Sequence, residues 1–184
     1  MTATGLITAL LFFFISQAKP LQKLSPFSPP SSIFAKSVII SICGQFLVHF
    51  LCIYSVLHIC REKLAGDLSS SRVIPDAPFQ ANLVNSCMYL LHLAIQNNNF
   101  VINYRGAPFT MSIWDNKMLW RSVQILYALL LLLVSDTFPP VNDLLQLVRL
   151  PNDIVFQYQL GLILVFDLTL LYLVEKGSQL LEKK

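Results

Sequence analysis

Residues 37–60, SVIISICGQFLVHFLCIYSVLHIC, decide the class of fold. These 24 residues contain no Asp, Glu, Lys or Arg. A hydrocarbon core of about 30 Å needs about 20 helical residues at 1.5 Å each, so the segment is long enough to cross a bilayer as one helix. The stretch therefore predicts a membrane-spanning helix.

Four further apolar blocks lie on either side of this segment. Residues 77–104 carry no charged side chain, residues 118–135 are interrupted only by Arg121, and residues 154–174 only by Asp167. Residues 5–15 are equally apolar but are only 11 residues long. The pattern predicts an all-α polytopic transmembrane helix bundle, with four full spans and one short or partial N-terminal span. We place the spans at about 3–16, 36–60, 79–104, 118–136 and 153–175.

The composition agrees with this class of protein. Of the 184 residues, 55% are hydrophobic and 12% are charged, whereas soluble domains contain about 25% charged residues. The connectors between the blocks are too short to bury a core of their own. We therefore expect residues 1–184 to form a single membrane domain without a soluble domain, and its main partner to be the lipid bilayer.

Basic residues predict the orientation. The first and third connectors and the tail hold nine Lys and Arg, whereas the opposite side holds four. The positive-inside rule places the C-terminus in the cytosol. The net charge of +3 then reflects topology, and we expect no nucleic-acid partner.

The N-terminus allows two interpretations. Five spans with a cytosolic C-terminus place Met1 on the far side, although no charged leader precedes the first block. Ser16 and Ala18 are small residues placed like a signal-peptide cleavage site, but residues 1–5 carry no positive charge. We favour a chain that begins part-way through a helix and is therefore a fragment.

Polar residues recur along the third block at steps of three and four. They are Asn82, Asn85, Tyr89, His92, Gln96, Asn99 and Asn103. This spacing places them in one stripe along a helix, which cannot face lipid. Hydrogen bonding between helices, at about 0.6–2 kcal/mol per contact, is the commoner role, and a polar lining for a substrate path is the alternative.

Two other blocks contain isolated polar side chains. Asp167 is the one acid inside a predicted span, where its insertion costs about 2.5–3.5 kcal/mol, so it should face the bundle, a partner or the interface. The candidate intramembrane polar contacts are Gln45, His49, Asn85, His92, Gln96, Asn99, Asn103 and Asp167. No phosphate loop, nucleophile elbow or metal-ligand spacing occurs, so we expect no catalytic residue, metal site or cofactor in this chain. The four cysteines are expected to pack as small buried hydrophobes.

Several short motifs resemble one known family. The third block ends in Asn103-Tyr104-Arg105-Gly106-Ala107-Pro108-Phe109, which is similar to the Asn-Tyr-x-Gly-x-Pro-Phe signature that closes the eighth membrane helix of type-V, subclass A, P-type ATPases. Lys19-Pro20-Leu21 resembles the segment that follows helix six of that family, and Gln45-Phe46-Leu47-Val48-His49 resembles part of helix seven. The resemblance covers about the first 110 residues by motif and the remainder by the layout of the spans.

This resemblance implies that the chain corresponds to membrane helices six, in part, to ten. The family comprises endoplasmic-reticulum transporters described as dislocases for misinserted transmembrane helices, and it uses ATP and Mg²⁺. The Asp-Lys-Thr-Gly-Thr phosphorylation motif and the nucleotide-binding domain of the family are absent from this sequence, so an enzymatic activity of the chain itself stays open.

The resemblance leads to a functional expectation with two alternatives. We expect an endoplasmic-reticulum membrane fragment that braces the transport helices, with the remaining parts of the ATPase and the transmembrane helices of client proteins as partners. We further expect Asn103, Tyr104, Gly106, Pro108 and Phe109 to end helix eight sharply and to rest on cytosolic domains of the parent. A free-standing subunit or adaptor without ATP turnover is the first alternative, and a channel or carrier that uses the polar stripe is the second.

Overall fold

The structure, a computed structural model, describes residues 2–23, 32–64, 82–148, 150–151 and 153–182. The described residues form the helices α1 (Thr2–Ser16), α2 (Lys36–Leu64), α3 (Leu83–Asn103), α4 (Lys117–Val134), α5 (Pro139–Leu144) and α6 (Ile154–Glu182). Within these residues, β-structure is limited to one isolated bridge between Pro20 and Thr110. The predicted all-α class is confirmed.

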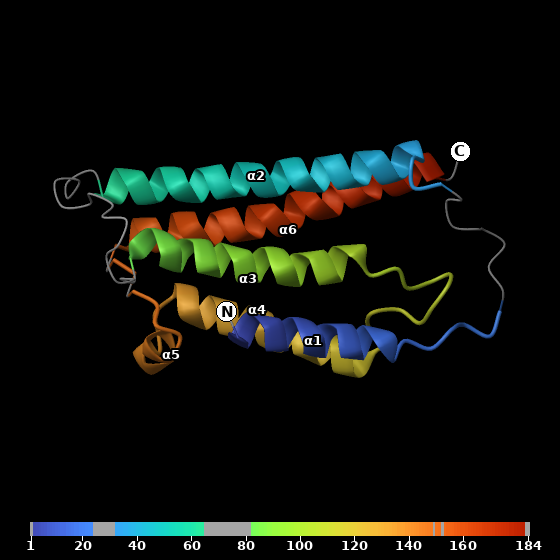
Figure 1. Cartoon of the computed structure of the whole chain (residues 1–184), viewed down its shortest axis with the longest axis horizontal. Helices are drawn as coiled ribbons and strands as arrows, with labels where there is room; N and C mark the ends of the chain where they lie inside the picture. Colours follow the sequence, from blue (N-terminus) through green and yellow to red (C-terminus); the bar gives the residue numbers. More distant parts are fainter. Residues whose placement is uncertain (1, 24–31, 65–81, 149, 152, 183–184) are drawn as a thin grey trace.

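The long helices lie side by side along one axis (Figure 1). The helix α2 packs along α6, α3 contacts both of them, and α1 lies against α4. The helix α1 covers only part of the length of the bundle, at the end where the α3–α4 connection and the C-terminal end of α6 also lie (Figure 1). The chain is therefore a bundle of nearly aligned helices with one shorter member.

Three helices in the described part of the chain are long and apolar enough to cross a membrane, namely α2, α4 and α6. The helix α1 is apolar but shorter. The helix α3 has 21 residues, and its amide side chains make it more polar than the other three. This polarity has a structural reason, because α3 lies between the other helices and directs much of its surface toward them.

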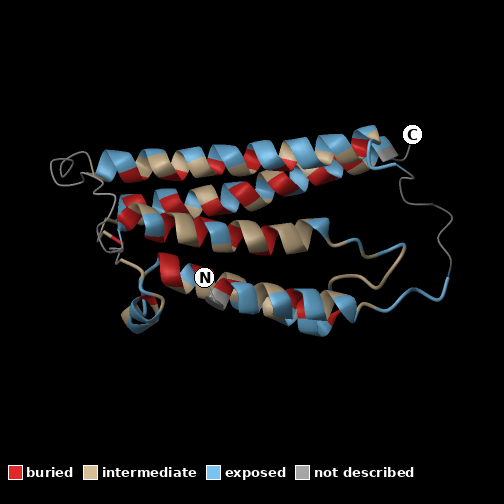
Figure 2. Cartoon of the chain, viewed as in Figure 1, coloured by how far each residue is buried: buried red, intermediate tan, exposed pale blue. Residues whose placement is uncertain are grey.

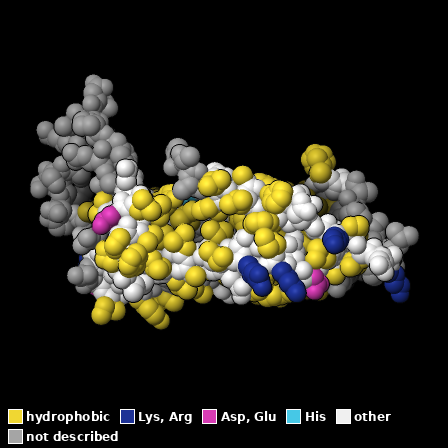
Figure 3. Space-filling view, turned by 90° about the horizontal axis from the view of Figure 1, so that it is seen from below, with side chains coloured by type: hydrophobic (Ala, Val, Ile, Leu, Met, Phe, Trp, Pro, Cys, Tyr) yellow, Lys and Arg dark blue, Asp and Glu magenta, His cyan; other side chains and the backbone are white. Residues whose placement is uncertain are grey.

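The outer surface of the bundle suits a lipid environment. Large apolar side chains are exposed along the outside of α2, for example those of Phe46 and Tyr54, whereas buried residues line the inner side of each helix (Figure 2). Figure 3 shows apolar side chains spread over another face of the bundle, with Lys and Arg side chains gathered toward one end. Exposed aromatic and aliphatic rows of this kind match hydrocarbon rather than water.

The buried apolar side chains form two clusters. The larger cluster joins α2, α3 and α6 with the end of α4, and it includes Val56, Leu91, Leu160 and Leu171. The smaller cluster consists of Leu11, Leu119 and Val123, which join α1 to the first half of α4. The helices α2, α3 and α6 therefore share one core, and α1 is held mainly by a separate one.

The ends of the helices follow local sequence signals in most places. The side chains of Asn82 and Asn116 accept hydrogen bonds from backbone N–H groups in the first turns of α3 and α4. The short helix α5 begins at Pro139, whose fixed φ suits the first turn, although the sequence predicted only a connector there. The helix α6 continues to Glu182, beyond the predicted end at residue 175.

Candidate intramembrane polar site

The centre of the site is the carboxylate of Asp167 on α6, which is fully buried. Its Oδ1 atom lies 2.8 Å from Nδ1 of His49 on α2, and its Oδ2 atom accepts a hydrogen bond of 2.8 Å from the Asn98 amide on α3. The Tyr127 hydroxyl on α4 donates to Asn98 Oδ1 at 2.7 Å. Four helices therefore meet at one acid, and we call these residues, together with Asn99, the Asp167 cluster.

The second ring nitrogen of His49 extends this cluster. Its Nε2 atom lies 3.2 Å from Oδ1 of Asn99. Both ring nitrogens thus face oxygen atoms, and only a doubly protonated imidazolium donates to both of them. In that protonation state His49 supplies the positive charge that a buried carboxylate in a membrane requires.

A second cluster surrounds Glu175, farther along α6. Its carboxylate accepts hydrogen bonds from the Ser41 hydroxyl at 2.6 Å, the Gln45 amide at 3.2 Å and the Gln179 amide at 3.1 Å. Gln45 also exchanges two amide hydrogen bonds with Asn103 on α3, at 3.0 and 3.1 Å. We call these residues the Glu175 cluster, and they join α2, α3 and α6 about 12 Å along α6 from Asp167, at 1.5 Å per residue.

Beside these clusters, α1, α3 and the α3–α4 connection enclose a groove of about 680 Å³. Its lining mixes amides with aromatic rings, including Phe12, Gln96, Asn99, Phe100, Asn103 and Tyr104. Asn99 and Asn103 therefore have two roles, because each lines the groove and also bonds to a residue of α2. The groove lining is connected to the two buried carboxylates through the contacts Asn99–His49 and Asn103–Gln45.

Across this groove, one polar side-chain contact joins α1 to α3 among the described residues. The Gln96 amide donates to the Thr8 hydroxyl, which in turn donates to the Thr4 carbonyl at 2.8 Å. At the end of α1, the Asn116 amide donates to the Phe14 carbonyl at 2.8 Å. The polar attachment of α1 is thus sparse beside the two clusters that join α2, α3 and α6.

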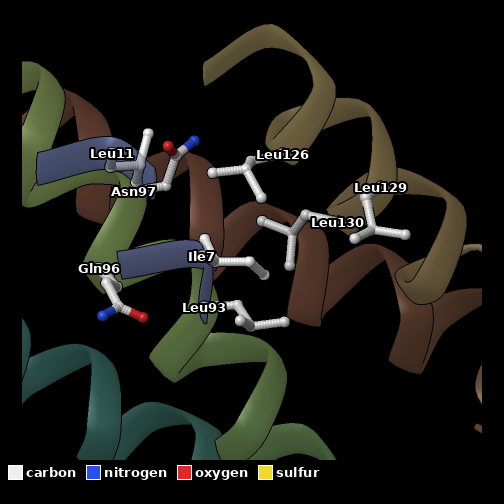
Figure 4. Close-up of a pocket in the computed structure, with 8 residues that line it drawn as sticks. All are labelled: Ile7, Leu11, Leu93, Gln96, Asn97, Leu126, Leu129 and Leu130. Atoms are coloured by element: carbon white, nitrogen blue, oxygen red, sulfur yellow. The ribbon is translucent and has the colours of Figure 1, made fainter. Parts of the chain in front are cut away.

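A much smaller cavity lies between α1, α3 and α4 (Figure 4). It has a volume of about 20 Å³, and the side chains of Asn97, Gln96, Ile7, Leu11 and Leu126 are among those that line it. Neither side-chain polar atom of Asn97 has a hydrogen-bond partner among the described residues, and the side chain is buried. A space of this size holds one water molecule, which would satisfy part of this amide.

The neighbouring residues Asn97 and Asn98 give a matched test of these contacts. We expect Asn98→Leu to destabilise the bundle by about 1–3 kcal/mol, because it removes the hydrogen-bond donor to the buried Asp167. Asn97→Leu is expected to be neutral or stabilising, since it replaces an amide without a protein partner in an apolar cavity. Unfolding of the purified protein in mixed micelles by SDS titration measures both. Equal losses of stability would contradict the assignment of partners.

The connection between α3 and α4 contains the motif of residues 103–109. The helix α3 ends at Asn103, and Tyr104 adopts an extended conformation. The Phe109 and Thr110 amides donate to the Gly106 carbonyl, both at 3.1 Å, and form a tight turn. A Cβ atom at Gly106 would lie 3.0 Å from the Met111 carbonyl oxygen, so a side chain has little room there.

This turn rests on the segment that follows α1. The Met111 amide donates to the Lys19 carbonyl at 3.0 Å, and the Leu21 amide donates to the Phe109 carbonyl at 3.4 Å. The Lys19-Pro20-Leu21 motif and the motif of residues 103–109 are therefore paired, although about 90 residues separate them in the sequence. The sequence did not predict that residues 19–21 contact this turn.

The structure brings together most of the candidate residues. Gln45, His49, Asn99, Asn103 and Asp167 lie in the two clusters, and Gln96 lies in the groove. Asn85 and His92 are exposed on α3, and their side chains make no hydrogen bond or ion pair with any described residue. The predicted stripe is thus divided between contacts to α2, the groove lining and an outer surface.

Sequence reasoning missed three important members of the site. Asn98 lies on the other side of α3, in phase with Cys87, Leu91 and Ala94, so a stripe traced from Asn82 does not include it. Tyr127 is a single polar side chain within an apolar helix and gives no pattern. Glu175 is the last residue of the predicted span 153–175 and was not predicted as a contact, whereas α6 continues past it and buries it.

Comparison with known proteins gives related sequences over most of the chain. The chain is 36% identical over 154 residues to "Probable manganese-transporting ATPase PDR2" of Arabidopsis thaliana, which covers 83% of this chain and 13% of that protein. It is 31% identical over 166 residues to the "Endoplasmic reticulum transmembrane helix translocase" of Saccharomyces cerevisiae, and 30% identical over 175 residues to the protein of the same name from Schizosaccharomyces pombe. These alignments cover 90% and 95% of this chain. No protein-family model matches the chain.

The lengths of these relatives differ greatly from that of the chain. The chain spans only 13 to 14% of the length of the curated relatives it matches. It therefore aligns with only a part of each of them.

Proposed function

Because this chain belongs to the family of type-V, subclass A, P-type ATPases, we propose that it braces the transport helices of such an enzyme. In this role it supports ATP-driven translocation or dislocation of transmembrane segments in the endoplasmic reticulum. The bracing unit consists of α2, α3 and α6, and α1 is the element that moves against it.

One observation carries this proposal. The helix α3 is joined to α2 and α6 through both buried carboxylate clusters, and its other side lines a groove of about 680 Å³ with α1. Each interhelical hydrogen bond in a membrane contributes about 0.6–2 kcal/mol, so the contacts of the two clusters together exceed the single polar contact between α1 and α3. A wall held in this way keeps its shape while the neighbouring helix moves.

The groove has side chains suited to a polypeptide segment in the membrane. Phe12 and Phe100 offer apolar rings, and Gln96, Asn99 and Asn103 offer amides that hydrogen-bond to polar groups. A client transmembrane helix of low hydrophobicity carries such polar groups and needs partners for them in hydrocarbon. We propose this class of client as the occupant.

The remaining partners and cofactors follow from the same proposal. ATP and Mg²⁺ would act in those parts of the relatives that the alignment does not include. Among the described residues, no group of three or more His, Cys, Asp or Glu is placed to hold a metal ion. The C-terminus is proposed to lie in the cytosol, with the turn of residues 103–109 facing the cytosolic domains.

The bracing role predicts the effect of Gln45→Leu. We expect this change to lower client-stimulated ATP hydrolysis by the full-length protein about 5- to 30-fold, the equivalent of about 1–2 kcal/mol, because it separates α3 from α2 and Glu175. The assay uses proteoliposomes with a synthetic transmembrane peptide of low hydrophobicity as the client. Asn85→Leu, on the exposed surface of α3, is the matched control and should leave the stimulation unchanged.

Two outcomes would contradict this proposal. One is stimulation of the parent protein by Mn²⁺ and not by the peptide, and the other is an equal effect of both leucine variants.

An immunoblot of native membranes with an antibody to residues 175–184 tests the alternative that the chain is a free-standing subunit. A band far heavier than 20.8 kDa supports the ATPase, and a single band at that mass would show a separate small membrane protein.

A further inference from the structure

Two cysteine thiols face each other between α2 and α3, at the end of the pair away from Gln45 and Asn103. Cys60 and Cys87 are both fully buried, and their thiols lie close enough to interact. Both belong to the larger core cluster, and both are free in this structure. The sequence offered no reason to pair them, because they lie 27 positions apart and belong to no CxxC motif.

The register of the two helices independently places them opposite each other. The contacts Gln45–Asn103 and His49–Asn99 show that a step of four residues along α2 matches a step of four back along α3. Cys60 lies 15 residues beyond Gln45, and Cys87 lies 16 residues before Asn103. At 1.5 Å per residue these are nearly equal distances of about 23 Å, so the antiparallel pair brings the two cysteines to the same level.

The two thiols also lie near the ends of their helices. Cys60 is one turn before the end of α2 at Leu64, and Cys87 is one turn after the start of α3 at Leu83. This end of the bundle is opposite to the α3–α4 connection (Figure 1). It lies on the lumenal side in the orientation proposed above, and the lumen of the endoplasmic reticulum is an oxidising compartment.

We infer that Cys60 and Cys87 are a disulfide site that links α2 to α3 at the lumenal end of the bundle. This inference rests on the membrane placement in the proposed function. The bond would hold the end of α3 that the two carboxylate clusters do not reach, so that α3 is fixed to α2 along its whole length.

The chemistry requires an oxidant of a stated class, namely a protein disulfide of a lumenal thiol oxidoreductase. One cysteine thiolate attacks a sulfur of that disulfide and forms a mixed disulfide, and one thiol of the oxidant leaves. The second cysteine thiolate then attacks the sulfur of the first cysteine and releases the other thiol. Two thiols of this chain are oxidised to one disulfide, and one disulfide of the oxidant is reduced to two thiols.

The test alkylates the full-length protein in endoplasmic-reticulum membranes with N-ethylmaleimide in SDS, before any reductant, and maps its cysteines by mass spectrometry. We expect Cys60 and Cys87 to be found in one disulfide-linked pair of peptides. The mass of this pair should be lower than the summed mass of the two unmodified peptides by two hydrogen atoms. Cys43, which is exposed, and Cys52, whose thiol faces the Ile163 carbonyl, are internal controls and should be alkylated. Cys60→Ser should make Cys87 available for alkylation without reductant.

Alkylation of both Cys60 and Cys87 in the unreduced protein would overturn the inference, and so would a bond from either one to Cys43 or Cys52. These outcomes are independent of the proposed function, because that function is tested by client-stimulated ATP hydrolysis. An intact disulfide in a protein without this stimulation would contradict the proposed function and leave the disulfide assignment standing.

Discussion

Replacing His49 with leucine is expected to destabilise the helix bundle by about 3–5 kcal/mol, the largest effect of any single substitution considered for this chain. The change removes the imidazole partner of Asp167, whose carboxyl group is fully buried and lies 2.8 Å from the ring. The Asn98 amide, which also bonds to that carboxyl group, is neutral and does not compensate a charge in hydrocarbon. The free energy of unfolding, measured by SDS titration in mixed micelles, reports the loss.

Two further variants show whether the loss comes from the unpaired charge. His92→Leu makes the same substitution at an exposed position of α3 and should change stability by less than about 0.5 kcal/mol. Adding Asp167→Asn to His49→Leu should restore much of the stability, because a neutral amide costs less to bury than a carboxylate. If the double variant were as unstable as His49→Leu alone, the pair would not be the source of the effect.

The second large effect is expected at Gly44, where α2 and α6 approach each other most tightly among the described glycine positions. A Cβ atom at Gly44 would lie 2.6 Å from Cγ1 of Val174. Val174 is β-branched and has few rotamers in a helix, so it cannot move aside easily. We expect Gly44→Leu to cost about 3 kcal/mol, by separating the two helices next to Gln45 and Glu175.

A matched substitution on α6 isolates this steric effect. A Cβ atom at Gly161 has no neighbour within 4 Å, so Gly161→Leu should stabilise the helix by about 0.5–1 kcal/mol through helix propensity alone. Adding Val174→Ala to Gly44→Leu should recover part of the loss, which a double-mutant cycle measures. Destabilisation by Gly161→Leu equal to that by Gly44→Leu would show that the close approach is not the cause.

The sequence predicted the class of the fold from the lengths of its apolar blocks. A bilayer sets a minimum length for a helix, and a charged side chain inside that length is costly, so residues 37–60 and 154–174 could be recognised without any tertiary information. The short motifs likewise indicated the family, which the related sequences confirm. The helix ends were predicted less well. The last span was placed at 153–175, whereas α6 continues to Glu182, and the Glu175 side chain bonds to Ser41 and Gln45 of α2.

The partners of the polar residues were decided only by the tertiary structure. Periodicity identified the stripe of α3 that includes Asn99 and Asn103, but it could not distinguish Asn99, which bonds to His49, from His92, which is exposed. Periodicity also did not identify Asn98, which bonds to Tyr127 on α4 and to Asp167 on α6.

The physical reason is the range of the interactions. Helix formation and insertion into a bilayer depend on the residues of one segment, so the sequence by itself determines an all-α membrane chain. A contact such as that between His49 and Asp167 joins residues 118 positions apart, and it forms only when the helices pack in one register. The sequence therefore identified the polar side chains within the apolar blocks, and the packing of α2, α3 and α6 decided which of them meet and which, such as His92, stay exposed.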